Sequence, residues 1–226
     1  MSTIVVKLGG RVAGEAAADA LALHLAGHDV VVVHGAGPQI SAELQDRGIP
    51  LEFVQGRRVT SAAVLEVVRE SFRAVNTEVC AAIGPDAVGL IGDEIGLLAR
   101  PVPGLGLVGD PLPVAPDAVV SALAAGFIPV VAPLAIHPEL GVLNVNADEA
   151  AAALAVGLEA ERILFVTDVP GVLVDGDLVA ALPVDDADRM LGAGAFEGGI
   201  VPKLNAAVRA VRRGVRAEIG ETKVLG

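Results

Sequence analysis

The chain has 226 residues, of which 53% are hydrophobic and only 2% aromatic, and its formal net charge is −12. The negative charge argues against a general nucleic-acid-binding protein, which needs a basic surface. The single cysteine, Cys80, excludes an intramolecular disulfide framework and a multi-cysteine zinc site. Met1 leads almost directly into an apolar strand pattern, and no apolar run reaches the roughly 18 residues of a membrane span. We therefore expect a cytoplasmic protein with neither a nucleic-acid nor a membrane partner.

Two strand patterns near the start of the chain each end in a glycine turn. The first carries Lys7 and ends at Gly9 and Gly10, and the second, 29–33, leads directly into the turn 34–38. Near-continuous β-branched runs are typical of parallel strands covered on both faces. Glycine turns at helix N-termini favour anions, because free N–H groups and the helix dipole attract negative charge. Neither turn matches a P-loop or a dinucleotide fingerprint.

The remaining pattern alternates helices and strands. We expect helices at 15–27, 39–47, 62–82, 117–126, 149–158, 185–191 and 204–213, and buried strands at 127–132, 163–166 and 223–225. Short strands at 88–98 and 106–114 are interpreted as a hairpin covering the site, 133–141 as a loop containing His137, and 175–176 as a hairpin turn. A break near 158–162 marks the expected boundary between two lobes.

Three polar clusters accompany these elements. Arg57 and Arg58 are either solvated surface residues or a fork that binds a carboxylate. The stretch 144–148, Asn-Val-Asn-Ala-Asp, precedes an alanine-rich helix, and any of its polar residues can be the N-cap. Three short polar residues exceed what a cap requires, so capping and function both remain open. Lys203 follows the glycine pair 198–199 just before the last helix.

This set of residues favours phosphoryl transfer. The sequence has no Ser-His-Asp order, no cysteine–histidine pair and no metal-ligand spacing. Phosphoryl transfer needs positioning and charge neutralisation more than covalent chemistry. Lys7 and Lys203 would offset negative charge on the attacking and leaving sides, and Asp148 would hold both lysines in place.

The motifs VVKLGG, VVVHGAGP, FVQGRRVT, LNVNADEAAAALA, LFVTDVPGVL and GGIVPKLNAAVRAV occur in this order along nearly the whole chain. In this respect the sequence resembles the amino acid kinase family. The resemblance implies a three-layer αβα sandwich with a mainly parallel central sheet, in two lobes. Residues 1–158 would bind the acyl amino acid and dimerise, and residues 159–226 would bind ATP. The arginine and Asn-Val-Asn-Ala-Asp motifs favour members that phosphorylate the γ-carboxylate of N-acetyl-L-glutamate in arginine biosynthesis.

The resemblance also implies roles for individual residues. Lys7 would stabilise the transferring phosphoryl group, Lys203 the leaving ADP, and Asp148 would orient both lysines. The acyl amino acid would be bound by Gly10, Gly35, Ala36, Arg58 and Asn144, and the nucleotide by Gly9, Thr167, Asp168, Val169, Gly171 and Lys203. Arg58 would hold the α-carboxylate and Asn144 the acetamido group. No side chain would ligate a metal, because the phosphates of ATP would hold Mg²⁺.

Four positions depart from the family pattern. Ala36 replaces a glycine, Arg57 an apolar residue, Asp93 a lysine and Glu221 a glycine. These departures weaken the substrate assignment more than the fold. The chain also lacks the N-terminal helix of hexameric, arginine-inhibited members, so we expect a homodimer insensitive to arginine.

Three alternatives remain. The nearest is a kinase for α-aminoadipate or glutamate attached to a small acidic carrier protein, although the net charge of −12 disfavours docking of an acidic partner. The second is a catalytically silent nucleotide-binding regulator, which has no need to retain Lys7, Asp148 and Lys203 together. The third, carbamate kinase or another distant relative, is disfavoured by the arginine and Asn-Val-Asn-Ala-Asp motifs.

Overall fold

The computed structural model of the protein describes residues 2–9 and 13–226. Its centre is an eight-stranded sheet with the strand order β14-β16-β15-β11-β1-β2-β8-β5. Every neighbouring pair is parallel except β15 and β16. The strands are β1 (Thr3–Leu8), β2 (Asp29–His34), β5 (Ala87–Ile91), β8 (Ile128–Ala132), β11 (Arg162–Val166), β14 (Ala181–Pro183), β15 (Arg216–Ile219) and β16 (Thr222–Leu225). The predicted mainly parallel sheet is confirmed.

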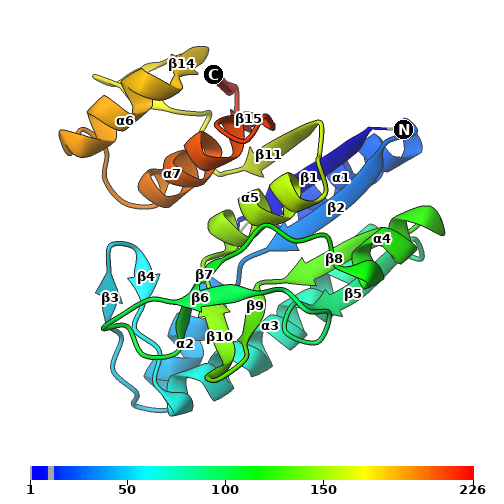
Figure 1. Ribbon diagram of the computed structural model, residues 1–226, viewed down its shortest axis with the longest axis vertical. Helices are drawn as coiled ribbons and strands as arrows, with labels where there is room; N and C mark the ends of the chain where they lie inside the picture. Colours follow the sequence, from blue (N-terminus) through cyan, green and yellow to red (C-terminus); the bar gives the residue numbers. More distant parts are fainter. Residues whose placement is uncertain (1, 10–12) are drawn as a thin grey trace.

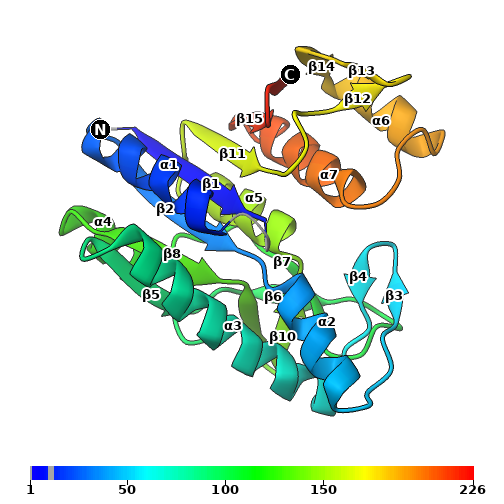
Figure 2. The same cartoon turned by 180° about the vertical axis from the view of Figure 1, so that it is seen from behind.

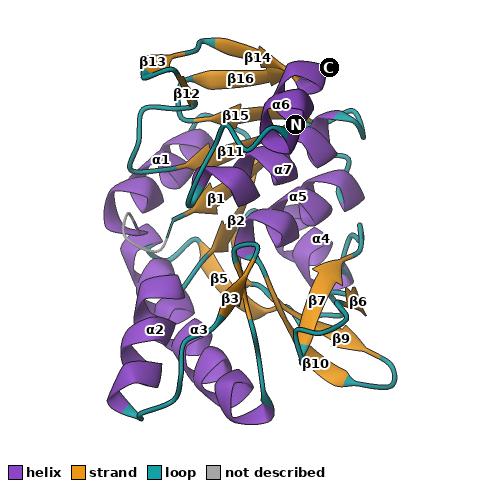
Figure 3. Ribbon diagram, turned by 90° about the vertical axis from the view of Figure 1, so that its left-hand side faces the viewer, coloured by secondary structure: helices purple, strands orange, loops and turns teal. Residues whose placement is uncertain are grey.

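Helices cover both faces of this sheet. They are α1 (Ala13–Leu25), α2 (Gly37–Asp46), α3 (Ala62–Ile83), α4 (Asp117–Ala124), α5 (Ala147–Gly157), α6 (Val184–Gly192) and α7 (Ile200–Val211). Figure 1 shows α4, α5 and α7 in front of the sheet, and Figure 2 shows α1, α2 and α3 on the opposite face. Seen from the side, the two helical layers lie on either side of the strands (Figure 3). The predicted three-layer arrangement is therefore confirmed.

The alternation of side chains along β1 explains why both layers are held. Successive residues of a strand point to opposite faces. Ile4 and Val6 pack in the cluster formed with α1, α2 and α3, whereas Val5 packs in the cluster formed with α4, α5 and α7. All three side chains are almost fully buried. Burying an aliphatic side chain of this size contributes roughly 1.5–3 kcal/mol to stability.

Three smaller sheets flank the main one. A four-stranded sheet has the order β6-β7-β10-β9, and two hairpins are formed by β3 with β4 and by β12 with β13. Their strands are β3 (Phe53–Val54), β4 (Arg57–Arg58), β6 (Ala99–Pro101), β7 (Val108–Pro111), β9 (Leu134–His137), β10 (Gly141–Val145), β12 (Leu173–Val174) and β13 (Asp177–Leu178). The predicted hairpin turn at 175–176 is confirmed, since it joins β12 to β13.

Two local predictions are wrong. The stretch 133–141 is not a loop, because β9 and β10 pair there as an antiparallel hairpin. Pro133 separates β8 from β9, so β9 is too short for its alternation to be recognised. The strands predicted at 88–98 and 106–114 also do not pair with each other. β5 instead joins the main sheet beside β8 and ends at Ile91, just before Gly92, where a Cβ would lie 2.1 Å from a backbone oxygen.

The parallel register brings the carboxyl ends of three strands together. Lys7 and Leu8 of β1 lie opposite Val33 and His34 of β2, and β1 also pairs with β11 through Val166. The turns that follow these strands therefore meet at one edge of the sheet, where ligands of open α/β sheets bind. β11 begins just after the predicted break near 158–162, and it pairs with β1, so the sheet is continuous across that break.

Candidate functional site

The sheet edge opens into a cavity of about 420 Å³. Its lining includes the predicted site residues Lys7, Gly9, Gly35, Ala36, Arg58, Asn144, Asp148, Thr167, Asp168 and Lys203. A second cavity of about 440 Å³ is lined by Val169 and Gly171 and shares Thr167, Asp168 and Lys203 with the first. The fold thus brings the predicted residues together from both ends of the chain. Gly10 lies outside the described residues.

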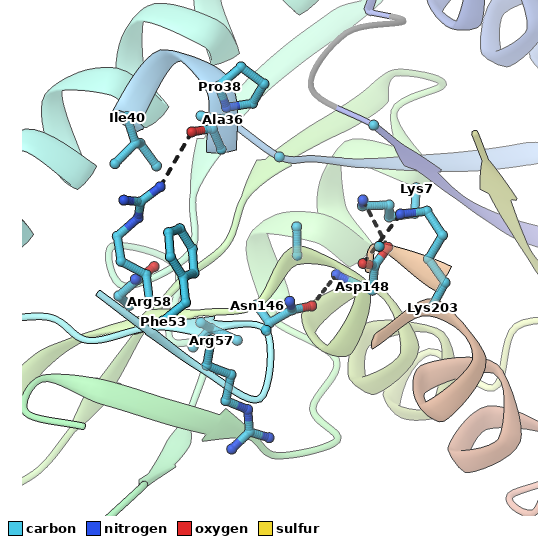
Figure 4. A pocket seen from close by; sticks show the side chains of 18 of the residues that line it. Lys7, Ala36, Pro38, Ile40, Phe53, Arg57, Arg58, Asn146, Asp148 and Lys203 are labelled. Atoms are coloured by element: carbon cyan, nitrogen blue, oxygen red, sulfur yellow. Dashed lines mark hydrogen bonds and ion pairs between the residues drawn. The ribbon is translucent and has the colours of Figure 1, made fainter. Parts of the chain in front are cut away.

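Asp148 lies between the two predicted catalytic lysines (Figure 4). Its Oδ1 is 2.8 Å from Lys7 Nζ, and its Oδ2 is 3.7 Å from Lys203 Nζ. The side chains of Lys7 and Asp148 are each 6% exposed, and that of Lys203 is 14% exposed. Burial lowers the pKa of Lys203, and the charge of Lys7 lowers it further, while Asp148 opposes both effects. The carboxylate therefore keeps two like charges close together.

The helix α5 presents Asp148 to the lysines. Asn146 is the N-cap, and its side chain accepts the N–H groups of Asp148 at 2.9 Å and of Glu149 at 3.2 Å. The structure thus divides the polar cluster 144–148 between two roles. Asn146 caps the helix, which is worth about 1 kcal/mol relative to alanine, and Asp148 in the first turn points into the cavity (Figure 4).

The turn after β2 has no need for glycine at Ala36. Ala36 is the N-cap of α2 with φ −139°, so an L side chain is accommodated there without a left-handed backbone. No side chain caps this helix. Gly37, the first residue of this helix, lines the cavity, and N–H groups at helix N-termini are anion sites in other proteins.

The buried side chain of His34 stabilises this turn by hydrogen bonding. Its Nδ1 lies 3.4 Å from the carbonyl oxygen of Gly35, and its Nε2 lies 3.1 Å from Asn76 Nδ2. Asn76 Nδ2 also donates to the carbonyl oxygen of Val130 at 2.8 Å. Burial lowers the pKa of His34 to about 4. The imidazole is therefore neutral near pH 7, with Nδ1 as donor to Gly35 and Nε2 as acceptor from Asn76.

Arg58 lies at the other end of the cavity from the lysines (Figure 4). Its Nη2 donates to Ser41 Oγ at 2.8 Å and to the carbonyl oxygen of Gly37 at 3.4 Å, and its guanidinium carbon lies 4.6 Å from the centre of the Phe53 ring. Burial lowers its pKa. Within the described residues, Arg58 Nη1 is buried without a hydrogen-bond partner. A carboxylate is the ligand that such a donor favours.

Asn144 is connected to Arg58 through a threonine. Asn144 Nδ2 donates to Thr60 Oγ1 at 3.0 Å, and Thr60 Oγ1 donates to the carbonyl oxygen of Arg58 at 2.8 Å. Thr60 is fully buried. The hydrogen bonds therefore fix β10 against β4. They link the side chain of Asn144 to the backbone of Arg58, the two residues predicted to bind the acceptor.

The second cavity is shaped by a tight packing contact at Gly171. A Cβ at this position would lie 2.6 Å from Thr222 Oγ1. That hydroxyl accepts the N–H of Val172 at 2.9 Å and donates to the carbonyl oxygen of Val179 at 2.7 Å. Glycine is thus needed so that the loop after β11 can lie against β16 and line the cavity.

Comparisons with known proteins identify the family of this chain. Residues 2–220 match the model of the amino acid kinase family. This chain belongs to the amino acid kinase family. It is 44% identical over 225 residues to the acetylglutamate kinase of Rubrobacter xylanophilus, covering 97% of this chain and 88% of that protein. It is 39% identical to the acetylglutamate kinase of Dinoroseobacter shibae, covering 96% of this chain and 80% of that protein.

Solved structures of the family share the fold. A Streptococcus mutans protein matches with a TM-score of 0.88 at 26% identity, covering 99% of this chain and 98% of that chain. Carbamate kinase from Giardia lamblia matches with a TM-score of 0.71 at 18% identity, covering 99% of this chain and 98% of that chain. At this lower identity the second likeness concerns the fold alone.

Several residues of the cavity wall were not among the predicted site residues. They are Gly37, Pro38, Ile40, Phe53, Gly56, Arg57, Phe72, Val108, Val145, Asn146, Ala147 and Gly199. Most are apolar or small, so nothing in their local sequence distinguishes them from core residues. Gly199 had a signal, because it belongs to the glycine pair that precedes Lys203.

Two departures from the family pattern lie away from the cavity. Asp93 accepts a hydrogen bond from Arg69 Nη1 at 2.8 Å and does not line the cavity. The side chain of Glu221 is exposed, and its N–H donates to the carbonyl oxygen of Pro170 at 2.8 Å. Neither residue contacts the lysines or Asp148, so neither alters the geometry described above.

Proposed function

We propose that this protein is an acetylglutamate kinase, which transfers the γ-phosphoryl group of ATP to the γ-carboxylate of N-acetyl-L-glutamate. The family match and relatives at 39–44% identity support a kinase with this acceptor. The observation in the structure that carries the proposal is Asp148 held between Lys7 and Lys203, with Arg58 across the same cavity.

In the proposed reaction, a carboxylate oxygen of the acceptor bonds to the γ-phosphorus while the bond to the ADP oxygen breaks. Lys7 offsets charge on the transferring phosphoryl group, and Lys203 offsets charge on the departing ADP. Asp148 holds the two ammonium groups in place. Such preorganised charges stabilise the transition state without reorganising during the reaction.

The remaining residues would bind the two substrates. Ala36 would donate its N–H to the phosphoryl oxygens, and the backbone of Gly35 and of the predicted Gly10 would lie against them. The N–H of Gly35 itself donates to the carbonyl oxygen of Leu8 at 3.2 Å. Arg58 would hold the α-carboxylate through its unpartnered Nη1, and Asn144 would hydrogen-bond the acetamido group. The nucleotide would lie in the second cavity, lined by Thr167, Asp168, Val169 and Gly171, with Gly9 at the junction. Residues 1–158 would then form the acceptor lobe and residues 159–226 the ATP lobe.

Magnesium would enter with ATP and be held by its phosphates. Both oxygens of Asp148 face lysines, so this carboxylate is a poor metal ligand. Among the residues that the structure describes, no group of three histidine, cysteine or carboxylate side chains is arranged to hold a metal ion. The protein itself would contribute the positive charge of the two lysines to the same phosphates.

The test is ATP-dependent hydroxamate formation by the purified protein with N-acetyl-L-glutamate, glutamate and α-aminoadipate in parallel. We expect product with N-acetyl-L-glutamate and none with glutamate or α-aminoadipate. No product from any of the three, with ATP binding intact, would contradict the proposal. The relatives named above disfavour the carrier-linked acceptor.

We also propose a homodimer that arginine does not inhibit, on the basis of the family resemblance. Sedimentation equilibrium and an assay with added arginine test this. A monomer, or loss of activity with arginine, would contradict it.

Within residues 2–9 and 13–226, no helix has the length and apolar character needed to span a bilayer.

A further inference from the structure

Arg57 and Arg58 are neighbours in β4, and their side chains point in opposite directions (Figure 4). This follows from the alternation of side chains along a strand. Arg58 faces α2, as described above. Arg57 instead extends to two carboxylates, with its Nη2 2.6 Å from Glu149 Oε1 and 3.4 Å from Asp110 Oδ1. The two arginines therefore have different tasks.

Asp110 extends this contact to the helix that carries Lys203. Arg209 donates to both oxygens of Asp110, from Nη1 at 2.8 Å and from Nη2 at 3.2 Å. Arg57, Asp110, Glu149 and Arg209 thus form one ion-pair cluster that joins β4, β7, α5 and α7. Glu149 directly follows Asp148, and Arg209 lies on the same helix as Lys203.

The centre of the cluster is shielded from water. The side chain of Glu149 is 11% exposed and that of Arg57 is 20% exposed. Burial raises the pKa of Glu149, while the hydrogen bond and the charge of Arg57 lower it. Within the described residues, Glu149 Oε2 is buried without a hydrogen-bond partner, and Arg57 donates to Oε1 at 2.6 Å. The charge of Arg209 adds to that of Arg57 in lowering the pKa of Glu149. The free energy of a buried ion pair depends strongly on its geometry, because the attraction must offset the cost of desolvating both charges.

The tip of the β3–β4 hairpin also lies close to the first turn of α7. An ideal Cβ on Gly56 would lie 3.9 Å from Pro202 Cγ, next to Lys203 in sequence. In both Figure 1 and Figure 2 the hairpin projects from the body of the molecule on the side where α7 begins. The ion-pair cluster, in addition, fixes the hairpin to α5 and α7.

We propose that Arg57 is a positioning residue that holds Arg58 at a fixed distance from Asp148 and Lys203. It acts through Glu149 on the first turn of α5 and through Asp110 and Arg209 on α7. An acceptor held by Arg58 is thereby aligned with the lysines that offset the charge of the phosphoryl group. The proposal rests on the proposed function only for the identity of that acceptor.

The kinetic test compares Arg57→Leu and Arg57→Lys with Arg212→Leu as a matched control. Arg212, the C-cap residue of α7, makes an exposed ion pair with Asp188 of α6, outside the cluster. In Arg57→Leu we expect kcat to fall and KM for N-acetyl-L-glutamate to rise, together lowering kcat/KM about 10²-fold, as for misplaced reacting groups. KM for ATP and the control variant should change less than about twofold, and Arg57→Lys should recover part of the loss.

Equal kinetics for Arg57→Leu and the control would overturn the proposal. The proposal would also be overturned if KM for N-acetyl-L-glutamate and KM for ATP rose equally, Tm fell, and Arg57→Lys restored neither. That pattern indicates a structural role only.

A second measurement needs no substrate. Amide hydrogen exchange of residues 52–59 should accelerate in Arg57→Leu, because the hairpin loses its anchor to α5 and α7. Unchanged exchange would overturn the proposal. If the wild-type protein is inactive with N-acetyl-L-glutamate, the proposed function fails, while the exchange result still decides the role of Arg57.

Discussion

Replacing Asp148 with asparagine tests the centre of the site. At an effective dielectric constant of about 20, its carboxylate attracts Lys7 by about 6 kcal/mol at 2.8 Å and Lys203 by about 4.5 kcal/mol at 3.7 Å, before desolvation. Desolvation offsets much of this, and breaking a buried pair by removing one partner typically costs about 3–5 kcal/mol. We expect a loss of that size in the free energy of unfolding of Asp148→Asn.

The same substitution should lower kcat by about 10²–10³-fold, because two preorganised charges lose their anchor. Asp148 raises the pKa of Lys203 against burial and the charge of Lys7. In the variant this pKa falls further, so the decline of kcat at high pH should begin at lower pH than in the wild type. Urea unfolding and hydroxamate formation across pH measure both effects. A kcat within threefold of the wild type, with an unmoved pH profile, would refute the role of Asp148.

Four further substitutions address neighbouring groups. Lys7→Ala and Lys203→Ala should each lower kcat by about 10²–10³-fold in the same assay, and near-normal turnover in both would remove the mechanism. Arg58→Lys should raise KM for the acceptor about tenfold, because an ammonium cannot replace a bidentate fork, whereas exposed Arg47→Lys should not. The depressed pKa of His34, about 4, means that stability present above pH 6.5 is lost as pH falls towards 4, by about 3 kcal/mol. The stability gap between the wild type and His34→Gln, measured by urea unfolding, should therefore narrow over that range, and a constant gap would contradict this assignment.

Much of the site could be predicted because its residues sit at strand ends. Lys7 lies near the carboxyl end of β1, at the edge of a parallel sheet where ligands are expected. Asp148 lies in the first turn of α5, after a strand of the separate four-stranded sheet, so its meeting with Lys7 also depends on how α5 packs against the main sheet. The Asn-Val-Asn-Ala-Asp cluster was ambiguous because a cap and a catalytic carboxylate have the same local composition. Only the contacts of Asn146 with backbone N–H groups separate the two.

The less predictable parts depend on long-range pairing. β14 and β15 have no counterpart in the prediction, since each is three or four residues long and acquires its strand character by pairing within the main sheet. The pairing of Arg57 with Glu149 and Asp110 was likewise hidden, because the partners come from distant elements. Adjacent arginines in sequence give no indication that one faces the substrate side and the other faces two carboxylates.

The charge of the cavity differs from that of the molecule. Among the described residues that line it are the cations Lys7, Arg58 and Lys203 and the anions Asp148 and Asp168, which leaves one net positive charge. Arg57 also borders the cavity, but its charge is paired with Glu149 and Asp110. The whole chain has a net charge of −12. The electrostatic field of the cavity charges acts on a small anion chiefly inside the cleft, because walls of low dielectric constant focus the field there. An acidic carrier protein would also be repelled by the net negative charge of the whole chain, so this charge distribution favours a free acyl amino acid as the acceptor.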